Sequence, residues 1–192
     1  MKLLLTITRR GLVLATAALA IAAASPAAAP KDAALGLGQL APEFALATLD
    51  GQTVRLSQLR GRFVVVHFAA TWCPFCNAEA PHLELLHKTY RDRGVQVLIV
   101  DIGESKRIVQ RSAQKLGFTF PVLLDADGSA AKLYAPPKSV QPDLGRDEVM
   151  VASNLLIDRD GRIRFFSLLD SAAFDAKLTA LRAVLDDLLT KP

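Results

Sequence analysis

Two cysteines with two residues between them are the clearest indication of chemistry in this chain. The sequence Cys73-Pro74-Phe75-Cys76 holds both cysteines of the 192 residues. Two thiols at this spacing can close into a disulfide and open again, and the thiolate is the species that reacts. A helix N-terminus stabilises such an anion with free N–H groups and the helix dipole, so we expect a helix to begin beside Cys73.

The residues around the pair predict a strand, a turn and a helix. Residues 63–68 (FVVVHF) form a nearly continuous apolar run that predicts a strand covered on both faces. Residues 69–72 are short enough for a turn, and Pro74 suits the first position of a helix. An amphipathic stretch follows Pro74, and we expect the helix to span residues 74–91.

The cysteine pair predicts chemistry rather than structural support. A disulfide that closes so small a loop stabilises a fold little. Small exported domains that depend on disulfides carry many more cysteines than two. We therefore interpret the pair as redox-active.

The N-terminus has the layout of an export signal. Lys2, Arg9 and Arg10 precede an apolar run that is short for a membrane span, and small residues follow it to Ala29. We expect residues 1–29 to be a signal peptide of the general secretory or the twin-arginine type, cleaved on export to the periplasm or beyond. Those residues hold three basic and no acidic side chains, so without them the net formal charge falls from +4 to +1. That balance gives no reason to expect a nucleic-acid partner.

The rest of the chain predicts a single α/β domain. We expect a flexible lead-in over residues 30–40 and a domain over residues 41–190, interrupted by an irregular, proline-containing inserted loop at 135–150. The patterns predict a hairpin over 44–56, strands over 62–68, 95–101, 120–124, 151–158 and 163–168, and helices over 74–91, 104–116, 129–134 and 174–189. Strands that alternate with helices predict a central mixed sheet with helices on both faces.

Three segments together resemble the thioredoxin superfamily, and more closely its exported TlpA/ResA-like members. These are residues 68–76 (FAATWCPFC), residues 79–81 (EAP) and residues 155–161 (LLIDRDG). The resemblance covers about residues 40–189 and implies a thioredoxin-like fold. It also implies that Cys73 attacks the disulfide of a client protein and that Cys76 resolves the mixed disulfide.

The resemblance implies partners as well. An exported reductant needs electrons, and the similar proteins imply a thiol-electron transporter in the membrane as donor. They also imply client disulfides on proteins of cytochrome c maturation or on copper-site proteins. We expect a monomer without a bound metal or other cofactor, in which the Cys73–Cys76 disulfide is the redox group. Oxidation of clients, the reverse direction, stays open.

The residues beside the pair have expected supporting roles. Cys73 should be exposed, with a pKa below the usual value of about 8.5, and Cys76 should be more buried. Pro74 and Phe75 should set the redox poise. Trp72 either flanks the sulfur as part of an apolar docking surface or is simply a packed aromatic side chain.

Two further side chains have a structural and a functional interpretation. His67 occupies the position at which thioredoxins have a buried carboxylate, so it could move protons; we favour a hydrogen-bonded core histidine. Glu79 could tune Cys76, but we favour a surface charge attracted by the helix N-terminus.

One position departs from the similar proteins. Most thioredoxin-like proteins have a cis-proline just before the strand that is LLID here, and this chain has Ala152 there. A proline removes a backbone donor and fixes the backbone, so its absence changes the expected docking edge around Val151 and Ala152.

Two alternative functions remain at this point. A copper chaperone could bind Cu(I) through Cys73, Cys76 and His67, since soft thiolates favour that ion. A peroxidase of the related peroxiredoxin group is the weaker alternative, because Ala70 and Val66 stand where its motif requires Thr or Ser and Pro.

Overall fold

The computed structural model describes residues 35–135, 152–168 and 174–191. The expected signal peptide, Val151 and the inserted loop from residue 136 onward lie outside the described residues. Across the described ranges, no helix is both long enough and apolar enough to cross a membrane.

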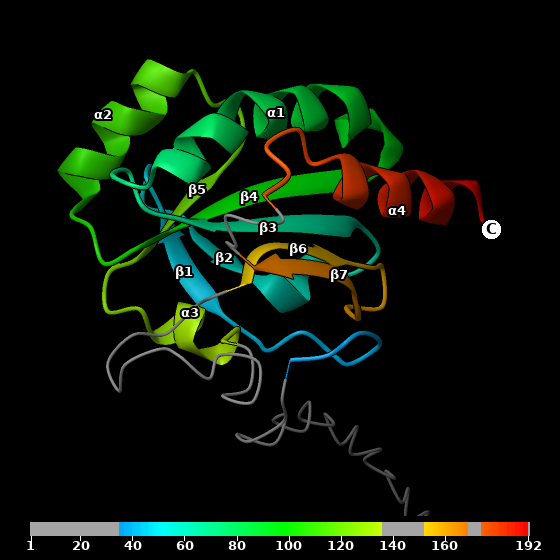
Figure 1. Cartoon of the computed structure of the whole chain (residues 1–192). Helices are drawn as coiled ribbons and strands as arrows, with labels where there is room; N and C mark the ends of the chain where they lie inside the picture. The colour runs from blue at the N-terminus through cyan, green and yellow to red at the C-terminus, as the bar shows by residue number, and fades with distance from the viewer. Residues whose placement is uncertain (1–34, 136–151, 169–173, 192) are drawn as a thin grey trace, which may run out of the picture.

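A seven-stranded mixed sheet forms the centre of the domain (Figure 1). The strand order is β2-β1-β5-β4-β3-β6-β7. The strands are β1 (Ala45–Thr48), β2 (Thr53–Arg55), β3 (Phe63–Ala69), β4 (Val95–Ile102), β5 (Val122–Asp125), β6 (Ala152–Ile157) and β7 (Ile163–Leu168). The predicted thioredoxin-like α/β class, the mixed sheet and the N-terminal hairpin β1–β2 are confirmed.

The pairing of the central strands decides where chemistry can occur. β3 pairs in parallel with β4, and β4 with β5, whereas β6 runs antiparallel to β3. The carboxyl ends of β3 and β4 therefore meet at one edge of the sheet, beside the start of β6. Open α/β folds bind ligands outside the carboxyl ends of their strands.

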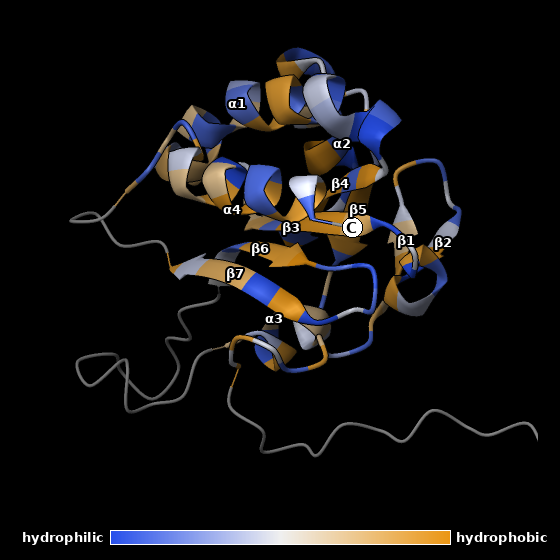
Figure 2. Ribbon diagram, turned by 90° about the vertical axis from the view of Figure 1, so that its right-hand side faces the viewer, coloured by the Kyte–Doolittle hydropathy of each residue, from blue (hydrophilic) through white to orange (hydrophobic). Residues whose placement is uncertain are grey.

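Helices cover both faces of this sheet (Figure 1). They are the α-helices α1 (Pro74–Tyr90), α2 (Lys106–Leu116), α3 (Ser129–Leu133) and α4 (Thr179–Thr190), with short 3-10 turns at Leu56–Leu59 and Arg91–Arg93. One core cluster joins the sheet to α1, α2 and α4, and the other lies on the α3 side. Figure 2 shows the pattern behind this arrangement: the central strands are mostly hydrophobic, whereas hydrophobic and hydrophilic residues alternate along the helices.

The predicted elements match the structure closely except at the last helix. We expected that helix from residue 174, but α4 begins at Thr179, so the expected start is wrong. Asp175 explains the difference: its Oδ2 accepts the N–H of Ala180 at 2.9 Å, and its carbonyl accepts the N–H of Leu178. Leu178, at the start of the helix, has a φ of 55°, which interrupts the helical backbone there.

The described part of the lead-in packs against the domain. Leu35 is buried, and Leu40 pairs with Arg162 in an isolated antiparallel bridge. The N–H of Gly38 donates to the carbonyl of Ile163 at 2.7 Å. Residues 35–40 therefore differ from the flexible segment that we expected from composition, because their backbone has partners beside β7.

Two leucines of α1 give a matched test of this arrangement. Leu83 is fully buried, whereas Leu85 is 50% exposed. We expect Leu83→Ala to lower the free energy of unfolding by about 2–5 kcal/mol, because it leaves a cavity in the core. We expect Leu85→Ala to change it by less than about 0.5 kcal/mol. Urea unfolding of the reduced proteins measures both, and equal losses would contradict the placement of α1.

Candidate active site

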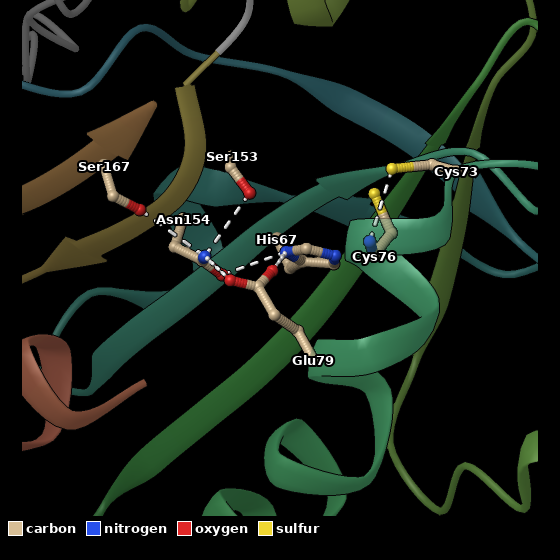
Figure 3. Close-up of polar contacts among 7 residues, drawn as sticks. All are labelled: His67, Cys73, Cys76, Glu79, Ser153, Asn154 and Ser167. Atoms are coloured by element: carbon tan, nitrogen blue, oxygen red, sulfur yellow. Dashed lines mark hydrogen bonds and ion pairs between the residues drawn. The ribbon is translucent and has the colours of Figure 1, made fainter. Parts of the chain in front are cut away.

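The first turn of α1 holds the cysteine pair as the sequence predicts. β3 ends at Ala69, and Cys73 is the N-cap of α1, with extended backbone angles and Pro74 at the first helical position. The Sγ of Cys73 accepts the backbone N–H of Cys76 at 3.3 Å (Figure 3). The helix N-terminus therefore offers a donor to a Cys73 thiolate.

The expected difference in exposure between the two thiols is wrong. Cys73 is 6% exposed and Cys76 is 8% exposed, so both are buried. The reason is the cap itself, because the bond to the N–H of Cys76 folds the Cys73 side chain back onto the helix. What distinguishes the two sulfurs is therefore their hydrogen bonding and not their solvent exposure.

Cys76 lies where ionisation is unfavourable. Burial raises the pKa of its thiol well above the usual range, and the hydrogen bond from Cys76 to Cys73 and the negative charge of nearby Glu79 raise it further. A thiol in this position stays protonated at neutral pH. Cys76 therefore needs a proton acceptor before its sulfur can react.

A buried polar network lies below the pair and joins three elements (Figure 3). Asn154 of β6 stands directly opposite His67 of β3 in the antiparallel register, and its Oδ1 lies 2.9 Å from the Nδ1 of His67. The amide Nδ2 of Asn154 donates to Oε1 of Glu79 at 3.0 Å. Because Asn154 Oδ1 can only accept, the proton of the His67 ring belongs on Nδ1.

Burial sets the charge state of this network. It lowers the pKa of His67 to about 4 and raises the pKa of Glu79 to about 7. Oε2 of Glu79 lies 3.4 Å from Nδ1 of His67, but Glu79 is itself neutral over most of the range in which His67 could take up a proton. His67 and Glu79 are therefore both neutral at mildly acidic pH, and Asn154 joins them through hydrogen bonds.

These contacts decide between the interpretations of His67 and Glu79. His67 is 1% exposed and hydrogen-bonded, which confirms the core histidine that we favoured. Glu79 is 3% exposed, so the surface charge that we favoured is wrong. Glu79 is buried because it faces the sheet from α1, where the Asn154 amide satisfies one of its oxygens.

A second pair of acids flanks the turn that precedes Cys73. Glu104 accepts hydrogen bonds from both the N–H and the hydroxyl of Thr71. Asp101, at the end of β4, is 3% exposed. Burial and the negative charge of Glu104 raise the pKa of Asp101 to about 7.

The remaining predicted residues lie around the rim of the site. Trp72 is 76% exposed, so the packed-aromatic interpretation is wrong. Phe75 is half-buried, and its ring packs edge-on against the ring of Phe174, with 4.9 Å between the ring centroids. Ala152 begins β6 and pairs with Leu168; no peptide bond of the described residues is cis. Val151 lies outside the described residues.

Three polar residues of the site had no predicted role. Asn154 and Asp101 stand in expected strands, and their polarity in an apolar run was a signal, whereas Glu104 stands at the start of an expected helix and gave no such signal. Of the residues with a predicted role, the structure brings Cys73, Cys76, His67 and Glu79 together.

The described ranges contain no group of three or more His, Cys, Asp or Glu side chains placed to hold a metal ion. His67 could add a nitrogen to the two sulfurs, but its Nδ1 is already bonded to Asn154.

Comparisons with known proteins identify the family of the chain. The sequence profile of the AhpC/TSA family matches residues 37–166. The thiol-disulfide oxidoreductase ResA of Geobacillus kaustophilus is 34% identical over 131 residues, which cover 68% of each chain. ResA of Bacillus subtilis is 36% identical over 97 residues, 50% of this chain and 54% of that protein.

Solved structures share the fold. A structure described as a putative protein disulfide isomerase from Bacteroides thetaiotaomicron superimposes with a TM-score of 0.67 at 28% identity, covering 82% of this chain and 92% of that one. A putative thiol:disulfide interchange protein DsbE from Chlorobium tepidum gives 0.62 at 24% identity, covering 81% and 99%.

The sheet order, the dithiol at the start of α1 and the match over residues 37–166 define a thioredoxin-like redoxin, and the chain belongs to the AhpC/TSA family. Within that family, the similarity to ResA proteins and the Cys73–Cys76 pair define a thiol–disulfide oxidoreductase of the ResA type.

The raised pKa of Glu79 predicts how stability depends on pH. In the unfolded chain Glu79 titrates near 4.5, and in the folded protein near 7. The folded state therefore binds more protons between these values, so the contribution of Glu79 is fully present below pH 4.5 and is lost as the pH rises through 7. We expect the stability of the wild type relative to Glu79→Gln to fall by about 1–3 kcal/mol across this window.

Urea unfolding of the two reduced proteins at several pH values measures this difference. The titrations of His67 and Asp101 occur in both proteins and largely cancel. A difference that does not change between pH 4.5 and pH 8 would contradict the assignment.

Proposed function

We propose that this protein is an exported reductant of disulfides in client proteins. The observation that carries the proposal is the asymmetry of the dithiol: a Cys73 thiolate has an N–H donor at the start of α1, whereas Cys76 is buried with a raised pKa. Cys73 is therefore the nucleophile and Cys76 the resolving thiol.

The reaction has two exchange steps. The Cys73 thiolate attacks one sulfur of the client disulfide, which breaks the client bond and releases one client thiolate. Cys76 then loses its proton and attacks the Cys73 sulfur, which releases the second client thiolate and forms the Cys73–Cys76 disulfide. The client gains two electrons, so the protein must be reduced again by a donor.

The compartment and the partners are part of the proposal. The basic and apolar layout of residues 1–29 supports export. An oxidising compartment requires an electron source, so we propose a thiol-electron transporter of the membrane as donor. The TlpA/ResA-like resemblance supports clients in cytochrome c maturation.

Copper binding has less support. Two buried thiols suit Cu(I), but no third ligand completes a site within the described residues. One equivalent of Cu(I) added to the reduced protein tests this alternative. Tight binding together with a disulfide that does not exchange would favour a chaperone over a reductant.

A peroxidase is also less well supported. The chain superimposes on the structure of peroxidoxin BcpB from Mycobacterium tuberculosis with a TM-score of 0.62, but at 24% identity this likeness shows the fold alone. Ala70 and Val66 still lack the hydroxyl and the ring that the peroxidase motif requires.

Single substitutions of the cysteines test the assigned roles. We expect Cys73→Ser to reduce turnover of a protein disulfide to the uncatalysed background, because the nucleophile is missing. We expect Cys76→Ser to accumulate a stable mixed disulfide with the client, visible as a heavier species in mass spectrometry without reductant. The assignment is reversed if Cys73→Ser accumulates the mixed disulfide instead.

Substitution of Trp72 tests the proposed docking surface for client proteins. Because its side chain is 76% exposed, we expect Trp72→Ala to change the free energy of unfolding by less than about 0.5 kcal/mol. We expect it to raise KM for a protein disulfide about tenfold, as loss of a central aromatic contact does. A small-molecule disulfide should react at the unchanged rate.

Leu133→Ala is the matched control for Trp72. Leu133 is 48% exposed and belongs to α3, on the other face of the sheet. Kinetics with the protein disulfide should be normal in this variant. An equal rise in KM for both variants would contradict a docking role for Trp72.

A further inference from the structure

A small cavity lies behind Cys76, on the side away from the contact between Asn154 and Glu79. Cys76, His67 and Asp101 line it, with Ala69 and Thr71 at the turn. Its volume of about 30 Å³ is enough for a water molecule or two. Figure 3 shows the imidazole of His67 between Asn154 and Glu79 on one side and Cys76 on the other.

Two polar atoms of this lining lack a partner within the part of the chain that the structure describes. They are Nε2 of His67 and Oδ1 of Asp101, both buried. A buried polar atom without a hydrogen bond costs free energy, so such atoms need an explanation. A buried water needs at least two polar partners. His67 and Asp101 line the same cavity as Cys76, and each has a polar atom without a partner to offer such a water.

The strand register explains why Asp101 faces Cys76. Asp101 of β4 is the parallel neighbour of Ala69 of β3, and His67 lies two residues earlier on the same face. This is the face that α1 and α2 cover. The carboxyl group therefore enters the site from the strand beside the one that carries His67.

Few charged groups surround the carboxyl group of Asp101. β3 contributes His67, α1 contributes Cys76, and the segment before α2 contributes Glu104. On β5, both oxygens of Asp125 are occupied by N–H groups of α3. The residues of α2 that line the cavity carry no charge: Val109, Ser112, Ala113 and Leu116.

We propose that Asp101 accepts the proton of the Cys76 thiol through a water that Nε2 of His67 holds in this cavity. This inference rests on the proposed dithiol exchange and names the acceptor that its second step requires. The S–H bond of Cys76 breaks, its proton passes to the Asp101 carboxylate, and the new thiolate attacks Cys73. The client thiolate leaves with the electron pair of the mixed disulfide, so no further oxidant or reductant is needed.

The charge states of the cavity suit this transfer. His67 is neutral above about pH 4, so its Nε2 can accept a hydrogen bond without taking the proton. Asp101 titrates near pH 7, where it can both accept a proton and release it.

The two thiol steps can be separated with dithiobis(nitrobenzoic acid). Cys73 of the reduced protein releases one coloured thiolate and forms a mixed disulfide; Cys76 then releases the second. We expect Asp101→Asn to slow the second release at least about tenfold at pH 7. The first release should change by less than about twofold.

The pH profile distinguishes proton transfer from a structural role. We expect the second release of the wild type to rise through an inflection near pH 7, and Asp101→Asn to lose this inflection. Asp92→Asn removes an exposed carboxyl group beyond the far end of α1 and should keep the rate and the profile. Glu79→Gln should keep the inflection, since Glu79 bonds to Asn154 on the other side of His67.

Each outcome of these measurements either supports or overturns the proposed role of Asp101. A normal second release in Asp101→Asn, or equal slowing of both releases, would overturn it. If Asp101→Asn does not fold, the wild type and Glu79→Gln decide: an inflection near pH 7 in both supports Asp101, and its loss in Glu79→Gln overturns the proposal. Release of only one thiolate by the wild type would contradict the proposed exchange itself, whatever Asp101 does.

Discussion

Exclusion of bulk solvent from the space beneath the first turn of α1 is the constraint on which the rest of the site depends. In water, the thiol of Cys76 and the carboxyl groups of Glu79 and Asp101 would have ordinary pKa values. Buried in this fold, each favours its neutral form. The Cys73 sulfur is equally buried but has the N–H of Cys76 as a donor. The same desolvation therefore makes the two thiols of one dithiol chemically different.

The sheet shields this space from bulk solvent because its polar groups are confined to one edge. β3 is covered on both faces and is apolar until His67. β4 is likewise apolar in its buried interior and becomes acidic at Asp101, near its carboxyl end. Asn154, on the antiparallel strand β6, lies directly opposite His67. The ionisable groups thus meet where parallel strands end, and the packed core below them excludes solvent.

The local parts of this arrangement could be predicted from sequence, and the long-range parts could not. The strand before Cys73 and the helix after it follow from neighbouring residues. Burial of Glu79 could also have been found, because it lies four residues before Leu83 on the same helical face. The pairing of His67 with Asn154 joins residues 87 positions apart and depends on the strand register. β3 and β6 are not joined by a hairpin turn, so no turn in the sequence fixes that register. The side chain of Cys73 folds back onto the helix because its sulfur accepts the N–H of Cys76, and amino-acid composition does not predict this contact.

The segment before β1 has a consequence for how the molecules behave in solution. β7 is an outer strand of the sheet, and the backbone of residues 38–41 occupies hydrogen-bonding groups of Gly161 and Ile163 at its start. An uncovered outer strand can pair with the same strand of another copy. Trimming the chain to residue 42 would leave these groups without their present partners and lengthen the uncovered edge of the sheet, which favours association edge to edge.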